Sequence, residues 1–196
     1  MLEIVVYSDY LCPWCWPAAV RLRDLQAEFP NQLKLVHKSY VLRPPEEGEK
    51  QFSEYHLQHR SRAHESTGLP YGMPAIGAPY PSSSMPALIA SKWMLLNHPE
   101  HFENFNLEMF QAFFEFGLDI SKYPILKQLA SSFGVDEDQF EAGVKDPKYE
   151  KLVLEDHANA KNEGVDGIPS VIIGDAAING AVPIEDYRQA IKKALA

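Results

Sequence analysis

The chain contains only two cysteines, Cys12 and Cys15, and they are separated by Pro13 and Trp14 in the motif CPWC. Two thiols at this spacing can form a reversible disulfide or supply half of a zinc site. The sequence has no second CxxC pair and few other candidate ligands nearby. We therefore expect thiol–disulfide chemistry at this motif, and no metal.

The pattern around the motif predicts that Cys12 caps the first helix, with Pro13 as the first helical residue and Cys15 as the third. Unpaired backbone N–H groups and the positive end of the helix dipole then favour the thiolate form of Cys12. We expect Cys12 to be the exposed nucleophile. Cys15, on the same face and within bridging distance, would resolve the mixed disulfide.

The elements that must position this motif follow a β-α-β pattern. A β-branched run at residues 3–7 precedes a helix with apolar residues at helical spacing, and a second β-rich run covers residues 32–42. The two strands should be parallel. After Gly167 the pattern is β-β-α, with Gly174 and Asp175 forming a hairpin turn.

Between these parts the sequence is mostly helical. Residues 99–117 carry a stripe of phenylalanines that predicts a helix packed in a core, and Asp146 and Pro147 are a typical N-cap and first helical residue. We therefore predict an α/β thioredoxin fold, formed by residues 1–50 and 164–196, that is interrupted by an α-helical insertion at 51–163.

The proline-rich loop at residues 69–86 is long enough to suggest a functional role. Its apolar residues Tyr71, Met73 and Tyr80 are candidates for the wall of a substrate groove. In the second strand, His37 or Lys38 could carry a proton for Cys15, but strand alternation allows only one of them to face it.

Three further histidines, His56, His59 and His64, lie close together in the segment "HLQHRSRAHE". The first two share a helix face at a spacing that metal sites can use, but most such pairs are solvated surface. We expect no metal site there.

Pro169 immediately precedes an apolar strand in "GIPSVIIG". A trans bond is the commoner form for an isolated X-Pro pair. In company with Cys12 and Cys15, however, we expect a cis bond that turns the backbone of Ile168 toward the cysteines.

Together, "CPWC" after a strand, the helical insertion and "GIPSVIIG" resemble the DsbA-like thioredoxin superfamily, in particular its cytosolic FrnE-type members. The resemblance implies a thiol–disulfide oxidoreductase with Cys12 as nucleophile and Cys15 as resolving cysteine. It also implies that Pro169 is cis and faces the pair, and that Ile168 offers backbone hydrogen bonds to a bound peptide or thiol. Pro13 and Trp14 would tune the redox potential.

Two related families provide an alternative function. Kappa-class glutathione transferases and 2-hydroxychromene-2-carboxylate isomerases resemble the same fold, but they typically have serine at the position of Cys12 and bind glutathione. The complete dithiol favours exchange chemistry here, with glutathione as a possible substrate or reductant and no other cofactor. A noncatalytic binding protein is a third alternative, and it predicts an inert cysteine pair.

Composition restricts the partners and the location. The net charge of −9 opposes binding to nucleic acid or to anionic membranes. The segment "MLEIVVYS" reads as a strand rather than a signal peptide, and no apolar run is long enough to span a membrane. We expect a cytoplasmic protein that acts on a disulfide- or thiol-containing protein or small thiol.

Overall fold

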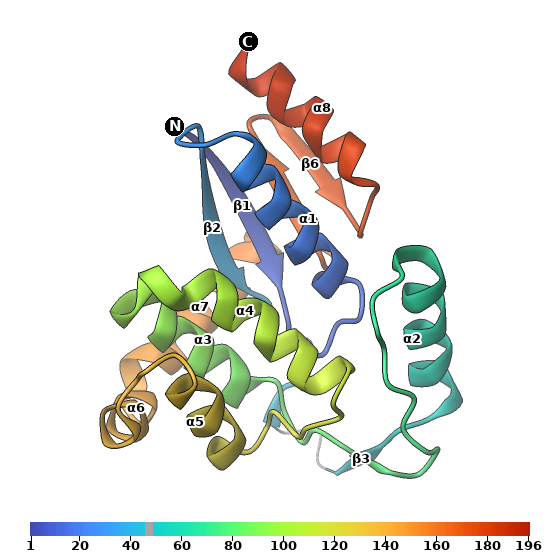
Figure 1. Ribbon diagram of the computed structural model, residues 1–196, viewed down its shortest axis with the longest axis vertical. Helices are drawn as coiled ribbons and strands as arrows, with labels where there is room; N and C mark the ends of the chain where they lie inside the picture. The colour runs from blue at the N-terminus through green and yellow to red at the C-terminus, as the bar shows by residue number, and fades with distance from the viewer. Residues whose placement is uncertain (46–48) are drawn as a thin grey trace.

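The computed structural model describes residues 1–45 and 49–196, and Figure 1 shows their arrangement. In chain order the elements are β1 (Leu2–Ser8), α1 (Cys15–Glu28), β2 (Leu33–Ser39), β3 (Lys50–Gln51), α2 (Glu54–Thr67), β4 (Pro79–Tyr80), α3 (Met85–Asn97), α4 (Pro99–Phe114), α5 (Tyr123–Ser131), α6 (Glu137–Val144), α7 (Pro147–Asn162), β5 (Ser170–Ile173), β6 (Ala176–Asn179) and α8 (Ile184–Leu195).

The main sheet has four strands in the order β2-β1-β5-β6. β1 and β2 are parallel, with Leu2 opposite Leu33 and Ser8 opposite Ser39. β5 runs antiparallel to β1 and to β6, and the β5–β6 hairpin turns at residues 174–175. The predicted β-α-β and β-β-α halves of a thioredoxin fold are therefore both confirmed.

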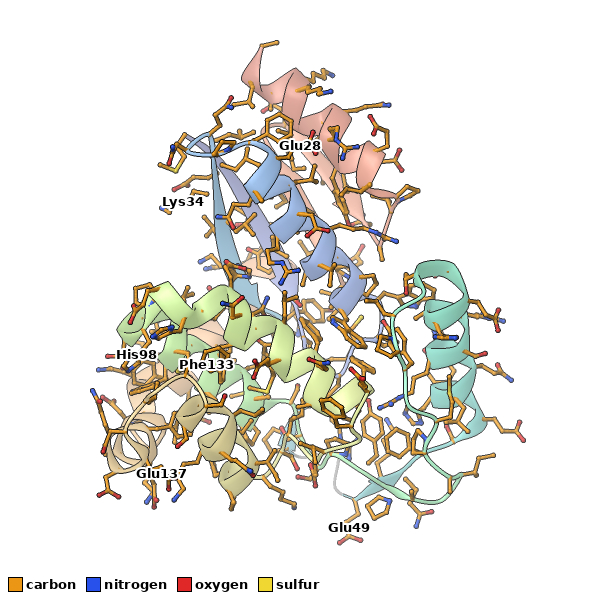
Figure 2. All side chains as sticks on the ribbon, in the orientation of Figure 1. Glu28, Lys34, Glu49, His98, Phe133 and Glu137 are labelled. Carbon is orange, nitrogen blue, oxygen red and sulfur yellow. The ribbon has the colours of Figure 1, made fainter. Side chains whose placement is uncertain are left out.

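Helices cover both faces of this sheet. Leu25 of α1 and Ile191 of α8 pack on one face with Ile4 and Val171, and these residues belong to what we call the sheet core. Glu28 lies at the end of α1 that is far from the cysteines (Figure 2). It accepts a hydrogen bond of 2.8 Å from Arg188 of α8. α7 lies against the opposite face.

Helices α3 to α6 pack around a second cluster, which we call the helical core. Its buried aromatic residues include the predicted phenylalanine stripe of α4, although Phe116 at the end of the stripe is exposed. Asp146 caps α7 as predicted, because its carboxylate accepts a hydrogen bond from the Lys148 N–H. No helix in the described residues is long and apolar enough to cross a membrane.

The segment that carries the CPWC motif belongs to the helical core and not to the sheet core. Tyr10, Cys12, Cys15 and Trp16 are all members of the helical core. Two short strands also pair with each other: β3, at the start of the predicted insertion, and β4, in its predicted proline-rich loop. These two-residue strands were not predicted. They hold the start of α2 beside the loop that ends at α3 (Figure 1).

Candidate active site

The motif CPWC forms a tight turn in front of α1 rather than its first helical turn. The Cys15 N–H donates to the Cys12 carbonyl at 3.1 Å, and Trp14 has φ −81° and ψ −17°. These angles fit the third position of a type I turn, and proline is favoured at the second. The expectation that Cys12 is the N-cap was therefore wrong, since α1 begins at Cys15 with Trp14 as its N-cap.

Both cysteines are free thiols, and their side chains hydrogen-bond to each other. Burial raises the pKa of the Cys15 thiol well above its ordinary value, and the hydrogen bond with Cys12 raises it further. The Ser8 side chain and the Asp9 backbone also hydrogen-bond to the Cys15 sulfur, and both act in the opposite direction. The Cys15 thiol is therefore protonated at neutral pH.

Cys12 is only 5% exposed, so the expectation of an exposed nucleophile was wrong. It nevertheless lines the wall of a cleft of about 380 Å³, together with Pro13 and Trp14, whereas Cys15 does not. The Cys12 Sγ lies 3.5 Å from the carbonyl oxygen of Ile168, to which it can donate. The cleft is therefore the opening from which Cys12 can be approached.

The segment opposite the motif contains the predicted proline. The Ile168–Pro169 peptide bond is cis. Ile168 and its neighbours Asp166 and Gly167 line the cleft across from Cys12. The structure thus brings the backbone before Pro169 to the same opening as the nucleophile candidate.

Asp9 is a functional residue that the sequence reasoning missed. It is buried, and its two carboxylate oxygens accept hydrogen bonds from the N–H groups of Leu11 at 2.7 Å and Leu42 at 2.9 Å. Its own carbonyl accepts from the Cys12 N–H at 3.2 Å. Burial raises the pKa of the Asp9 carboxyl to about 6, although the side chain of Ser84 and the two N–H groups lower it. Asp9 thus joins the cysteine turn to the loop after β2.

Two tyrosines from the proline-rich loop contact the same turn. The Tyr71 hydroxyl donates to the Pro13 carbonyl at 2.6 Å, and the Tyr80 hydroxyl lies 3.5 Å from the Leu11 carbonyl. Tyr80 also lines the cleft, as predicted for this loop. Tyr71 is buried behind the turn and does not line the cleft, and neither does Met73, which is half exposed. The prediction was therefore wrong for these two residues.

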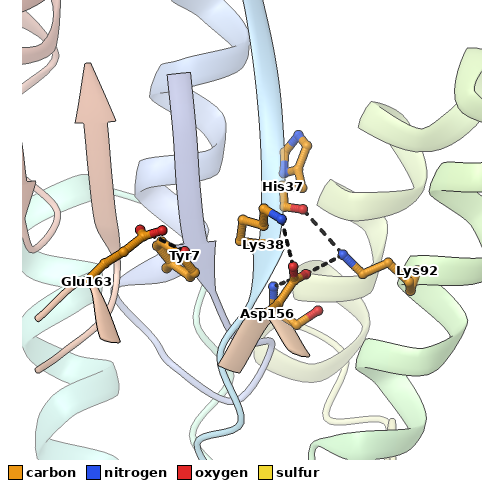
Figure 3. Close-up of polar contacts among 7 residues, drawn as sticks. Tyr7, His37, Lys38, Lys92, Asp156 and Glu163 are labelled. Atoms are coloured by element: carbon orange, nitrogen blue, oxygen red, sulfur yellow. Dashed lines mark hydrogen bonds and ion pairs between the residues drawn. The ribbon is translucent and has the colours of Figure 1, made fainter. Parts of the chain in front are cut away.

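Neither His37 nor Lys38 hydrogen-bonds to Cys15. His37 Nε2 pairs with Glu103 at 2.8 Å, and Lys38 donates to Asp156 at 2.9 Å on the other face of the strand. Figure 3 shows Lys38 and Lys92 converging on the Asp156 carboxylate. The prediction that one of the two directly carries the proton of Cys15 therefore finds no contact to support it.

The histidines of α2 also have other partners. His56 accepts from the Ser53 N–H and stacks on Tyr80, His59 lies 3.5 Å from the Trp14 Nε1, and His64 contacts the Leu69 carbonyl. Among the described residues, no group of three or more His, Cys, Asp or Glu side chains is placed to hold a metal ion.

The wall of the cleft is more basic than the molecule as a whole. It contains the cationic side chains of Arg43, Lys50 and Arg60, against the single carboxylate of Asp166 among the described lining residues. Arg60 is buried and donates to the carbonyls of Gly72 and Phe114, so it also anchors α2 to α4. Around Cys12, the aromatic and basic lining suits a compact, partly apolar substrate.

Comparison with known proteins gives relatives that match nearly the whole chain. An uncharacterised Bacillus subtilis protein, YwbO, is 27% identical over 199 residues, which cover 97% of this chain and 96% of YwbO. The crystal structure of a Nitrosomonas europaea protein, provisionally described as a protein disulfide isomerase, has a TM-score of 0.85 at 22% identity and covers 99% and 97% of the two chains.

A third relative is the cytosolic disulfide reductase DsbM from Pseudomonas aeruginosa. It has a TM-score of 0.78 at 19% identity, and the match covers 99% of this chain and 98% of DsbM. The model of the DSBA-like thioredoxin domain matches residues 3–192. This match and the fold agree with the resemblance found in the sequence, and the chain belongs to the DSBA-like thioredoxin domain family.

Proposed function

We propose that this protein is a thiol–disulfide oxidoreductase in which Cys12 is the nucleophile and Cys15 the resolving cysteine. The observation that carries the proposal is the pair of hydrogen-bonded free thiols of which only Cys12 lines the cleft. A disulfide that enters the cleft meets Cys12 first. Cys15 lies behind it, protonated and shielded from competing substrates.

The reaction has two exchange steps. In the first, the Cys12 thiolate attacks one sulfur of the substrate disulfide, a Cys12–substrate disulfide forms, and the other substrate sulfur leaves as a thiolate. In the second, Cys15 loses its proton and attacks Cys12, and the remaining substrate thiolate leaves. The protein is oxidised and the substrate disulfide is reduced to two thiols. The reverse sequence oxidises a dithiol substrate.

The residues around Cys12 support these roles. The carbonyl of Ile168 faces the Cys12 sulfur at 3.5 Å, and the Tyr71 hydroxyl donates a hydrogen bond of 2.6 Å to the carbonyl of Pro13. Both contacts restrict the turn. A fixed turn keeps the two sulfurs at the short separation that the second step requires. Pro13 and Trp14, as parts of this turn and of the cleft wall, are proposed to tune the potential.

Small thiol disulfides are proposed as substrates, with glutathione as a substrate or reductant. The size and basic lining of the cleft support a compact anion, and one structure of DsbM, similar at a TM-score of 0.74, contains GSH. A glutathione transferase or isomerase activity has less support, because both positions of the motif hold thiols. A FrnE-type assignment and a cytoplasmic location remain predictions of the sequence.

Replacement of each cysteine tests the assignment. Cys12→Ser should abolish reduction of a disulfide such as oxidised glutathione, whereas Cys15→Ser should still react once and remain as a mixed disulfide. Mass spectrometry identifies that adduct at Cys12. Turnover that survives in both variants would contradict the proposal, and glutathione conjugation that persists in Cys15→Ser would favour the transferase alternative.

A further inference from the structure

The proposed second step needs a route for a proton, and this inference rests on the proposed function. Cys15 is 1% exposed and does not line the cleft, so solvent in the cleft does not reach its thiol. Burial keeps the thiol protonated at neutral pH. The attack on Cys12 therefore requires that the proton leave through the protein interior.

Ser8 is the hydroxyl group that contacts this thiol. It is the last residue of β1, and its side chain hydrogen-bonds to the Cys15 sulfur. A hydroxyl can accept a hydrogen bond from a thiol and donate its own proton elsewhere at the same time. After the proton has left, the same hydroxyl can turn and donate to the thiolate, which lowers the pKa of Cys15.

Ser8 also lines a small cavity that shares no lining residue with the cleft and whose wall includes several polar side chains. The cavity has a volume of about 20 Å³. Because one water needs roughly 10–15 Å³ and two to four polar partners, this cavity suits a single buried water. Its polar lining includes Ser8 of β1, Tyr10 of the loop after β1, His37 and Lys38 of β2, Ser91 and Lys92 of α3, and Asn106 of α4.

The cavity wall provides hydrogen-bonding groups that are held in place, and part of it is exposed to solvent. The Tyr10 hydroxyl hydrogen-bonds to Ser91 at 2.7 Å and to Asn106 at 2.8 Å. Lys92 reaches the His37 carbonyl at 3.4 Å, as Figure 3 shows. The side chain of Lys38, by contrast, is 32% exposed, so this part of the wall meets solvent.

We propose that Ser8 and one water in this cavity form the proton relay for Cys15. The Cys15 proton passes to the Ser8 oxygen while the Ser8 proton passes to the water, which releases a proton to bulk solvent past Lys38. The sulfur of Cys15 keeps its electron pair and bonds to Cys12. The bond between Cys12 and the substrate sulfur breaks, and the substrate leaves as a thiolate.

The relay can be separated from the first exchange step with 4,4′-dithiodipyridine, a disulfide that releases a coloured thiopyridone. Attack by Cys12 releases the first thiopyridone, and attack by Cys15 releases the second. Stopped-flow absorbance therefore records both steps in one trace. Ser8→Ala should leave the rate of the first phase unchanged. It should slow the second phase by roughly tenfold to a hundredfold, because a positioned proton acceptor usually accelerates a reaction by about a hundredfold or more.

Three comparisons make this test specific to the hydroxyl. Ser8→Thr keeps the hydroxyl and should restore most of the second-phase rate, and Ser121→Ala removes a buried hydroxyl outside the cavity and should change neither phase. In the parent protein, the second phase should be slower in D₂O. The size of this isotope effect should fall in Ser8→Ala.

Two outcomes would overturn the relay and leave the proposed function intact. One is a second phase in Ser8→Ala within about twofold of the parent rate, which is far below the effect of general base catalysis. The other is equal slowing in Ser8→Ala and Ser8→Thr, which assigns the effect to packing. If Ser8→Ala does not fold, absence of an isotope effect in the parent protein is decisive. Absence of both phases in the parent would instead contradict the proposed function.

Discussion

Asp9 shows how one buried side chain can organise a reactive turn. Its carboxylate accepts hydrogen bonds from the N–H groups of Leu11 and Leu42, which belong to two separate loops. Its backbone carbonyl accepts a hydrogen bond from the N–H of Cys12. A carboxylate is suited to this position because it offers acceptors only. The disadvantage is the cost of a buried charge, because no ion pair with Asp9 is found among the described residues.

This cost predicts a pH dependence of stability. Burial raises the pKa of Asp9 from 3.8 to about 6, so the folded state binds a proton more tightly than the unfolded state. The contribution of Asp9 to the free energy of unfolding is therefore largest below pH 4. It should fall by about 3 kcal/mol as the pH rises through 6. Urea unfolding of the parent protein and of Asp9→Asn, from pH 4 to pH 7, measures this contribution as the difference between their free energies of unfolding. A constant difference between the two proteins would contradict it.

The hydroxyls of Tyr71 and Tyr80 allow a matched comparison at the same turn. Tyr71 donates to the Pro13 carbonyl at 2.6 Å, whereas Tyr80 lies 3.5 Å from the Leu11 carbonyl, at the limit of a hydrogen bond. Tyr71→Phe should lower the free energy of unfolding by about 1 kcal/mol, and Tyr80→Phe by clearly less. Urea denaturation measures both. A larger loss in Tyr80→Phe would mean that the short bond to Pro13 does not stabilise the fold.

At the scale of elements, a buried ionic contact fastens the helical part to the sheet. Asp156 of α7 accepts hydrogen bonds from Lys92 of α3 at 2.5 Å and from Lys38 of β2 at 2.9 Å, and also from the Ser39 N–H (Figure 3). These partners lower the pKa of Asp156 against the effect of burial. Three elements that are distant in the sequence thus meet at one carboxylate.

The two lysines differ in exposure, which predicts unequal contributions. The Lys92 side chain is 10% exposed and that of Lys38 is 32% exposed. Lys92→Met should lower the free energy of unfolding by about 3 kcal/mol, because a buried carboxylate loses a buried partner. Lys38→Met should cost less than about 1 kcal/mol, as for a partly solvated pair. Chemical denaturation at neutral pH provides both values. Equal losses would show that burial does not set the strength of this contact.

The elements could be predicted where the sequence repeats a pattern over many residues. The periodicity of α4, the cap at Asp146 and the hairpin turn at Gly174 are local signals, and each was placed correctly. β3 and β4 are two residues long, so they carry no pattern. The start of α1 was misplaced because a type I turn and a first helical turn favour the same residues, with proline near the beginning.

The site was predictable only where its residues are recognisable in a motif. Cys12 and Cys15 stand out by type and spacing. Asp9 left one usable signal. An aspartate in a loop often accepts a hydrogen bond from the N–H two residues later, as Asp9 does from Leu11, and this contact defines an Asx turn. The contacts of Ser8 with Cys15 and of Tyr71 with Pro13 are tertiary. No local pattern indicates them, because they depend on how the loop and the turn pack.

At the scale of the whole molecule, the active site and the sheet depend on different cores. Cys15 and Tyr10 lie in the helical core, where the Tyr10 ring packs against Phe110 of α4 with centroids 4.8 Å apart. Ile191 of α8 lies in the sheet core. Loss of packing in the helical core should therefore reach the cysteines directly, whereas loss in the sheet core should reach them only through global unfolding.

Two core truncations test this division in a Cys12→Ser background, in which Cys15 is the only thiol. Phe110→Ala and Ile191→Ala should each lower the free energy of unfolding by roughly 2–5 kcal/mol, because both side chains are fully buried. In native buffer, labelling of Cys15 by a thiol reagent should accelerate in Phe110→Ala beyond what its global stability explains. In Ile191→Ala, the labelling rate should follow global stability alone. If labelling followed global stability in both variants, the two cores would open together. Local opening of the helical core would then not determine the accessibility of Cys15.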